Sequence, residues 1–73
     1  MSLAKGKMYT VRHSMLAWDS NSKGHVLPAG KCVVVIDIKD CLWGYVLDLL
    51  AHDGTIVNTS ISHENAEYWF RKV

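Results

Sequence analysis

Three segments of the chain have the composition of strands, and the first of them holds three consecutive valines and two isoleucines. They span residues 31–38, 42–51 and 55–61. β-branched side chains are restricted about χ1 and pack well on the pleated surface of a sheet. Short polar or glycine-containing segments separate the three. The pattern therefore predicts three consecutive antiparallel strands.

The pairing of these strands depends on the two turns between them. We centre the first turn on Asp40 and assign Asp53-Gly54 to a two-residue type I′ turn, which this dipeptide favours. Paired positions share one face of a sheet, because side chains alternate with a period of two. Both turns select one apolar face, which holds Cys32, Val34, Ile36, Ile38, Leu42, Val46, Leu50, Val57 and Ile61. The opposite face is also apolar, so we expect the sheet to curl on itself.

The flanking segments complete the predicted fold. A first strand is expected over residues 7–13 and a polar loop over residues 19–24. Ser62 suits a helix N-cap, so residues 63–70 are predicted to form one or two helical turns. Residues 71–73 are expected to return as a short final strand.

A length of 73 residues corresponds to one domain. We predict a flexible start at residues 1–6 and a single domain over residues 7–73. The first three residues also fit a remnant of an expression vector, which carries no information on the fold.

This order of elements resembles an SH3-like small β-barrel over residues 8–73. The segments that carry the resemblance are Trp18-Asp19 for the RT loop, Leu27-Pro28-Ala29-Gly30 for the lead-in to the second strand, Trp43 for the start of the third strand, and Asp53-Gly54 for the distal hairpin. The resemblance implies an all-β fold, namely an SH3-like five-stranded antiparallel barrel with a short C-terminal helical turn.

The chain departs from SH3 domains that bind Pro-rich peptides. Asn58 stands at the position of the groove proline, and Asp19 is the one acidic residue of the loop over 19–25. Bacterial and phage SH3-like domains that lack the peptide-binding residues bind other proteins, cell-wall peptides or nucleic acid. The short, motif-poor chain also resembles phage or mobile-element accessory proteins, which bind and modulate a larger partner.

Composition excludes several classes of protein. Hydrophobic residues make up 49% of the chain, and the net charge of +1 is too small for an intrinsically disordered chain. The longest uncharged apolar run, residues 32–36, is far shorter than the roughly 20 residues of a membrane-spanning helix, so no membrane association is expected. Two cysteines are too few for a disulfide framework, and we interpret them as reduced thiols of a cytoplasmic protein. The four histidines lack CxxC or HExxH spacing, so neither a metal nor a cofactor is expected.

Catalysis is not expected from the nucleophiles of this chain. Cys41, His52 and Asp53 supply the residue types of a catalytic triad. They lie at opposite ends of one predicted strand, roughly 30 Å apart at about 3.3 Å per residue. We therefore predict that the protein is not an enzyme.

Charge is distributed unevenly and supports an alternative function. The first 31 residues hold five bases and one acid, a net charge of +4. The bases are Lys5, Lys7, Arg12, Lys23 and Lys31. Basic residues interleaved with aromatic residues can hold phosphates and stack bases. The alternative is thus a small nucleic-acid-binding barrel that uses the basic N-terminal segment.

Aromatic residues are the leading candidates for a binding surface. Tryptophan and tyrosine are enriched at the energetic centres of interfaces. We expect Trp18 and Trp43 to line one shallow groove, with Tyr45 or Tyr9 beside them, and the opposite interpretation is that both indoles plug the ends of the barrel. The sequence therefore predicts a small protein-interaction module, with a protein partner and with a homodimer as a further arrangement.

Overall fold

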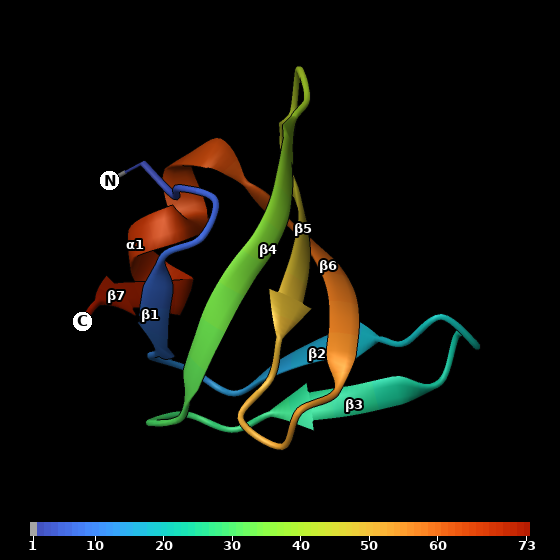
Figure 1. The fold of residues 1–73 in the computed structure, drawn as a ribbon. Helices are drawn as coiled ribbons and strands as arrows, with labels where there is room; N and C mark the ends of the chain where they lie inside the picture. Colours follow the sequence, from blue (N-terminus) through green and yellow to red (C-terminus); the bar gives the residue numbers. More distant parts are fainter. Residues whose placement is uncertain (1) are drawn as a thin grey trace.

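The computed structural model describes residues 2–73, in which seven strands form one antiparallel sheet that curls into a half-barrel (Figure 1). The strands are β1 (Met8–Val11), β2 (Met15–Trp18), β3 (Gly24–Leu27), β4 (Cys32–Asp40), β5 (Gly44–Leu50), β6 (Ile56–Ser62) and β7 (Phe70–Lys72). A 3-10 turn, His63–Asn65, and the short helix α1, Ala66–Trp69, connect β6 to β7. The strand order is β3-β2-β6-β5-β4-β1-β7. The predicted all-β class, the curled antiparallel sheet and the short C-terminal helix are confirmed.

The predicted number of five strands is wrong, because the segment between β1 and β4 forms a hairpin of its own. β2 pairs with β3 along its whole length and also pairs with β6. The carboxylate of Asp19 closes the hairpin loop by accepting hydrogen bonds from the backbone N–H groups of Asn21, at 2.9 Å, and Lys23, at 3.0 Å. Side chains of this kind often satisfy backbone donors in turns.

The loop between β5 and β6 has three residues, not the predicted two. The N–H of Ala51 donates to the carbonyl of Thr55 at 2.8 Å, so residues 52–54 form the connection. Gly54 has a φ of +88°, which is typical of the third residue in such a loop. The pairing of β5 with β6 is therefore shifted by one residue from the predicted register. A shift of one residue moves the side chains of a strand to the opposite face.

The turn between β4 and β5 also lies further along the chain than the predicted turn centred on Asp40. Cys41 and Gly44 exchange backbone hydrogen bonds at 2.7 and 3.3 Å, which leaves Leu42 and Trp43 as the two central residues. Neither of these two has a positive φ, so the turn differs from the type I′ geometry of many short hairpins.

The one-residue shift between β5 and β6 exchanges the inner and outer faces of β5 relative to β6. A bulge between Val35 and Asp37 takes back one residue of the shift at the β4–β5 turn, so Val34 and Leu50 share a face. Of the nine residues on the predicted apolar face, only Val57 and Ile61 are buried. The core is made of Leu3, Tyr9, Val11, Met15, Ala17, Leu27, Val33, Val35, Leu47, Leu49, Ala51, Val57, Ile61, Ala66 and Phe70.

The residues before β1 contribute to this core. Leu3 is buried, and the N–H of Gly6 donates to the carbonyl of Val35 at 2.7 Å. The N–H of Ala4 donates to the hydroxyl oxygen of Tyr9 at 2.8 Å. The predicted flexible start covers residues 1–6. Met1 lies outside the described residues, whereas these contacts hold the later part of the segment against the sheet.

Gly44 marks a close approach between two backbones. A Cβ at this position would overlap the carbonyl oxygen of Ile61 and would lie 2.9 Å from the Cα of Ser62. The neighbouring atoms belong to the backbone of β6, which cannot move aside as a flexible side chain can. The absence of a side chain at Gly44 therefore allows β5 to pair with the end of β6.

We expect Gly44→Ala to destabilise the protein by about 1–3 kcal/mol or more, the usual cost of overpacking a tight site. For a domain of this size each kcal/mol corresponds to a decrease of roughly 4–8 °C in Tm, which thermal unfolding followed by circular dichroism would measure. Gly24→Ala is the matched control, because its Cβ would lie 3.7 Å from the Trp18 indole, an ordinary contact. Equal Tm values for the two variants would contradict the close approach at Gly44.

Candidate binding surface

The outer face of the sheet carries a row of apolar side chains that crosses four strands. The Cα register pairs Met8 of β1 with Val34 of β4, Val34 with Leu50 of β5, and Leu50 with Ile56 of β6. Met8 is 48% exposed, Leu50 37% and Ile56 60%, and Val34 is partly buried between its neighbours. We call these four residues the apolar row. Since adjacent strands lie about 4.8 Å apart, the row extends over roughly 15 Å.

The apolar row has acidic residues on one side. Asp48 lies two positions before Leu50 on β5 and pairs with Asp37 of β4 and with Asn58 of β6. The amide of Asn58 donates to the Asp48 carboxylate at 2.9 Å, and Lys5 lies 3.9 Å from the Asp37 carboxylate. This flank therefore presents two carboxylates, each of which has polar neighbours.

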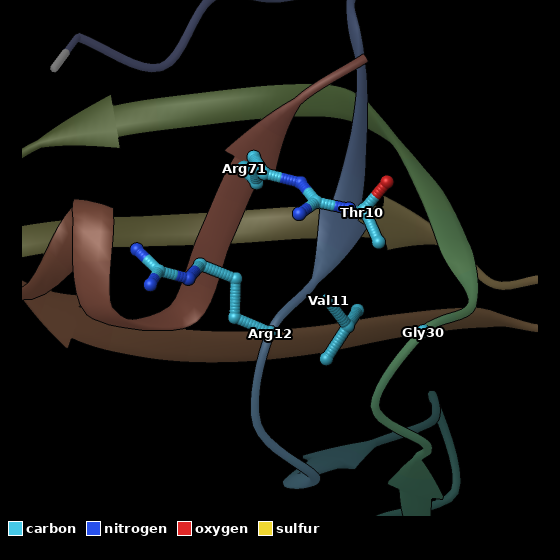
Figure 2. A pocket seen from close by; sticks show the side chains of 5 residues that line it. All are labelled: Thr10, Val11, Arg12, Gly30 and Arg71. Atoms are coloured by element: carbon cyan, nitrogen blue, oxygen red, sulfur yellow. The ribbon is translucent and has the colours of Figure 1, made fainter.

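A small pocket lies on the other side of the apolar row (Figure 2). Its volume is about 190 Å³, and its lining residues are Thr10, Val11, Arg12, Gly30 and Arg71. Thr10 lies two positions from Met8 on the same face of β1, and its cross-strand partners are Cys32 of β4 and Arg71 of β7. The pocket therefore adjoins the apolar row.

The two arginines of the pocket differ in what they contact. Arg12 donates from Nη1 to the carbonyl of Glu67 at 2.6 Å, and its backbone N–H donates to the carbonyl of Trp69 at 2.8 Å. Through these two hydrogen bonds Arg12 connects α1 to the end of β1. Figure 2 shows the Arg71 side chain extending from β7 toward Thr10. Among the described residues the Arg71 side chain has no hydrogen bond or ion pair.

The predicted aromatic residues do not come together in one groove. Tyr9 is buried in the core and packs edge-on against Phe70, with ring centroids 6.1 Å apart. Trp18 is paired with Asn58, whereas Trp43 precedes Gly44, which is paired with Ser62. These two positions of β6 are four residue steps apart, a distance of about 13 Å at 3.3 Å per residue.

Each of the three other aromatic residues has its own environment. Trp18 is half-exposed, and its indole lies against Gly24 on β3. Tyr45 is partly buried and packs against the core, and its ring meets His63 edge-on at 4.8 Å. Trp43 is 58% exposed beside the fully exposed Leu42, at the end of the β4–β5 hairpin that projects from the sheet in Figure 1. Neither indole is enclosed in the barrel.

The predicted basic residues are spread over the surface. Lys5 neighbours Asp37 on the acidic flank, and Lys23 lies in the loop between β2 and β3. Lys7 precedes β1, and Lys31 follows Gly30 of the pocket. Of the predicted set, Arg12 alone is among the lining residues of the pocket.

Sequence reasoning missed Arg71 and the apolar row. Arg71 is 61 residues from Thr10 in the chain, and only the pairing of β1 with β7 places the two together. Leu50 and Ile56 become neighbours on an outer face only when the loop at residues 52–54 has three residues. The sequence signal for that loop was the glycine after Asp53, which fits two loop lengths.

Two histidines each pair with an aspartate. His25 lies 2.8 Å from Asp19, and His63 lies 2.6 Å from Asp40. Within residues 2–73 there is no group of three or more His, Cys, Asp or Glu side chains that could hold a metal ion. Cys32 and Cys41 are both free thiols. No helix in the described part of the chain has the length and hydrophobicity needed to cross a membrane.

No protein-family model matches this chain, and neither curated proteins nor solved structures gave a match in the comparisons with known proteins.

We expect Trp43→Ala to leave the stability within about 1 kcal/mol of the wild-type value, because removing an exposed side chain creates no cavity. Phe70→Ala should instead cost about 3–5 kcal/mol, since it empties a buried site. Chemical denaturation followed by circular dichroism would measure both. A large loss of stability in Trp43→Ala would show that this indole belongs to the core.

The hydrogen bond from His25 and the backbone N–H of Lys23 both lower the pKa of Asp19 below its ordinary value of 3.8. Because the pKa is lower in the folded state, Asp19 stabilises that state above pH 3.8, and this contribution is lost as the pH falls through the folded-state pKa. We therefore expect the Tm difference between wild type and Asp19→Asn to be full at about pH 5 and to shrink in stronger acid. Other carboxylates titrate in both proteins, so the difference isolates Asp19. A difference that stays constant with pH would contradict this assignment.

Proposed function

We propose that the protein is a small interaction module whose partner is another protein, bound on the outer face of the sheet. The observation that carries the proposal is the apolar row of Met8, Val34, Leu50 and Ile56. Single exposed apolar residues are common on proteins, but contiguous apolar surface bordered by polar residues is typical of binding sites. The row has polar flanks on both sides.

The physical basis of binding would be removal of the row from water. Burying apolar surface contributes about 25 cal/mol per Å², and only part of this gain appears as affinity. The row lies on paired strands, so little conformational entropy would be lost on binding. An interface of standard size covers about 800 Å² on each partner. That area exceeds the row itself, so the flanking rows would take part in the contact.

The resemblance to an SH3-like barrel belongs to this proposal. The strand order supports it, since the β2–β3 hairpin occupies the position of the RT loop between the first strand and β4. The apolar row lies on the outside of the half-barrel and does not depend on the aromatic groove of peptide-binding SH3 domains.

Nucleic-acid binding by the basic N-terminal segment is the weaker candidate. A nucleic acid offers a series of phosphates, and affinity grows with the number that basic residues neutralise. The bases of this segment lie on different parts of the surface, and Asp37 neighbours one of them, Lys5. Affinity capture from the native host, with and without nuclease and at two salt concentrations, distinguishes the two. Capture that nuclease abolishes and salt weakens steeply would favour nucleic acid.

We expect Ile56→Thr to weaken binding of the captured and purified partner at least about fivefold, the effect of losing a residue important for an interface. Threonine keeps the β-branched shape, so the Tm should change little. Val26→Thr is the matched control, because Val26 on β3 is equally exposed and lies outside the apolar row. Isothermal titration calorimetry gives the affinities. Equal affinities of Ile56→Thr and wild type, or an equal loss in Val26→Thr, would overturn the proposal.

A further inference from the structure

The pocket beside the apolar row is suited to an anion. Its five lining residues include two arginines and no acid. Thr10 adds a hydroxyl, whose nearest partner is the Cys32 sulfur at 3.9 Å, too far for a strong hydrogen bond. Arg71 has no intramolecular partner among the described residues. Its guanidinium group therefore keeps its donors for a ligand.

The second arginine of the pocket, Arg12, is held by a hydrogen bond within the protein. The Arg12 guanidinium donates to the carbonyl of Glu67, which fixes the side chain against α1. In Figure 2 its side chain extends away from Thr10 and Gly30, and its guanidinium group lies near the acidic side chain of Glu67. Of the two arginines, Arg71 is therefore the one with donors left for a ligand, and Arg12 adds at most a long-range positive charge.

We propose that this pocket binds a carboxylate of the protein partner, from an aspartate, a glutamate or the C-terminus, with Arg71 as the main ligand. The inference rests on the proposed function, because the carboxylate would belong to the protein that covers the apolar row. A guanidinium group can bind a carboxylate through two parallel hydrogen bonds. The partner segment would present apolar side chains followed by an acidic group.

The surroundings of the pocket favour a carboxylate over the phosphates of a nucleic acid. The flank on the far side of the apolar row presents Asp37 and Asp48, which would repel a polyanion. Lys23 lies in the loop between β2 and β3, which is on the opposite side of the molecule from β7 in Figure 1. A single pocket, separated from this acidic flank by the apolar row, therefore suits a single acidic group.

The pocket can be tested without the partner. We would titrate the isotope-labelled protein with sodium acetate at constant ionic strength and follow the amide signals and the Arg71 Nε–H signal by NMR. We expect saturable shifts at Thr10, Gly30 and Arg71. These shifts should disappear in Arg71→Gln and persist in Lys23→Gln, a matched control that removes the same charge elsewhere. Shifts that do not saturate, or that persist in Arg71→Gln, would overturn the site.

A titration with an oligothymidylate tests whether the pocket binds the phosphates of a nucleic acid instead of a carboxylate. If the oligonucleotide binds the pocket more tightly than acetate, and Arg71→Gln abolishes that binding, the ligand is a nucleic acid and the carboxylate proposal is wrong. If its signals shift weakly and equally in wild type and Arg71→Gln, the proposal stands.

Binding of the purified partner separates this inference from the proposed function. Arg71→Gln should weaken binding about 10- to 100-fold, as expected for the loss of hydrogen bonds to a charged group, while Lys23→Gln binds as the wild type does. Arg71→Lys keeps the charge without the two parallel donors and should recover part of the loss. If Ile56→Thr weakens binding and Arg71→Gln does not, the pocket inference fails and the proposed function stands. If neither variant weakens binding, both fail.

Discussion

The left-handed backbone of Gly54 holds the loop between β5 and β6 at three residues, and the arrangement of the sheet depends on that length. With the loop closed by Ala51 and Thr55, β6 meets β5 in a register that turns Leu47 and Leu49 inward. A loop one residue shorter would exchange the two faces of one strand relative to its neighbour. Leu50 and Ile56 would then no longer share the outer face. The length of this loop therefore affects both the core and the exposed apolar surface.

The class of fold could be predicted from the sequence because it depends on composition summed over long segments. Residues 31–38 are rich in β-branched residues, and no single position determines that they form a strand. The register could not be predicted, because it depends on small energetic differences between turns. Asp53-Gly54 fits loops of two and of three residues, and nothing nearby in the sequence decides between them. The bulge between Val35 and Asp37 likewise has no strong local signal.

The candidate site was harder to predict than the fold, because long-range pairing assembles it. Trp18 and Trp43 are residue types that favour interfaces, yet the structure separates them along β6. Tyr9 is a core residue whose hydroxyl is used by the backbone of Ala4. Arg71 and Thr10 meet only because β7 returns to pair with β1. Residue type alone therefore does not distinguish exposed aromatic residues from buried ones. The order and register of the strands do.

The two edge strands of the sheet show how a small open half-barrel can resist edge-to-edge association with other chains. An unpaired edge strand is a template for aggregation, because its backbone groups can pair with another chain. The edge strands of this sheet are the four-residue β3 and the three-residue β7. Pro28 follows β3 directly and has no N–H to extend the ladder, while β7 ends in Arg71 and Lys72, which repel a second copy of the same edge. Short length, proline and like charge thus limit growth of the sheet from both sides.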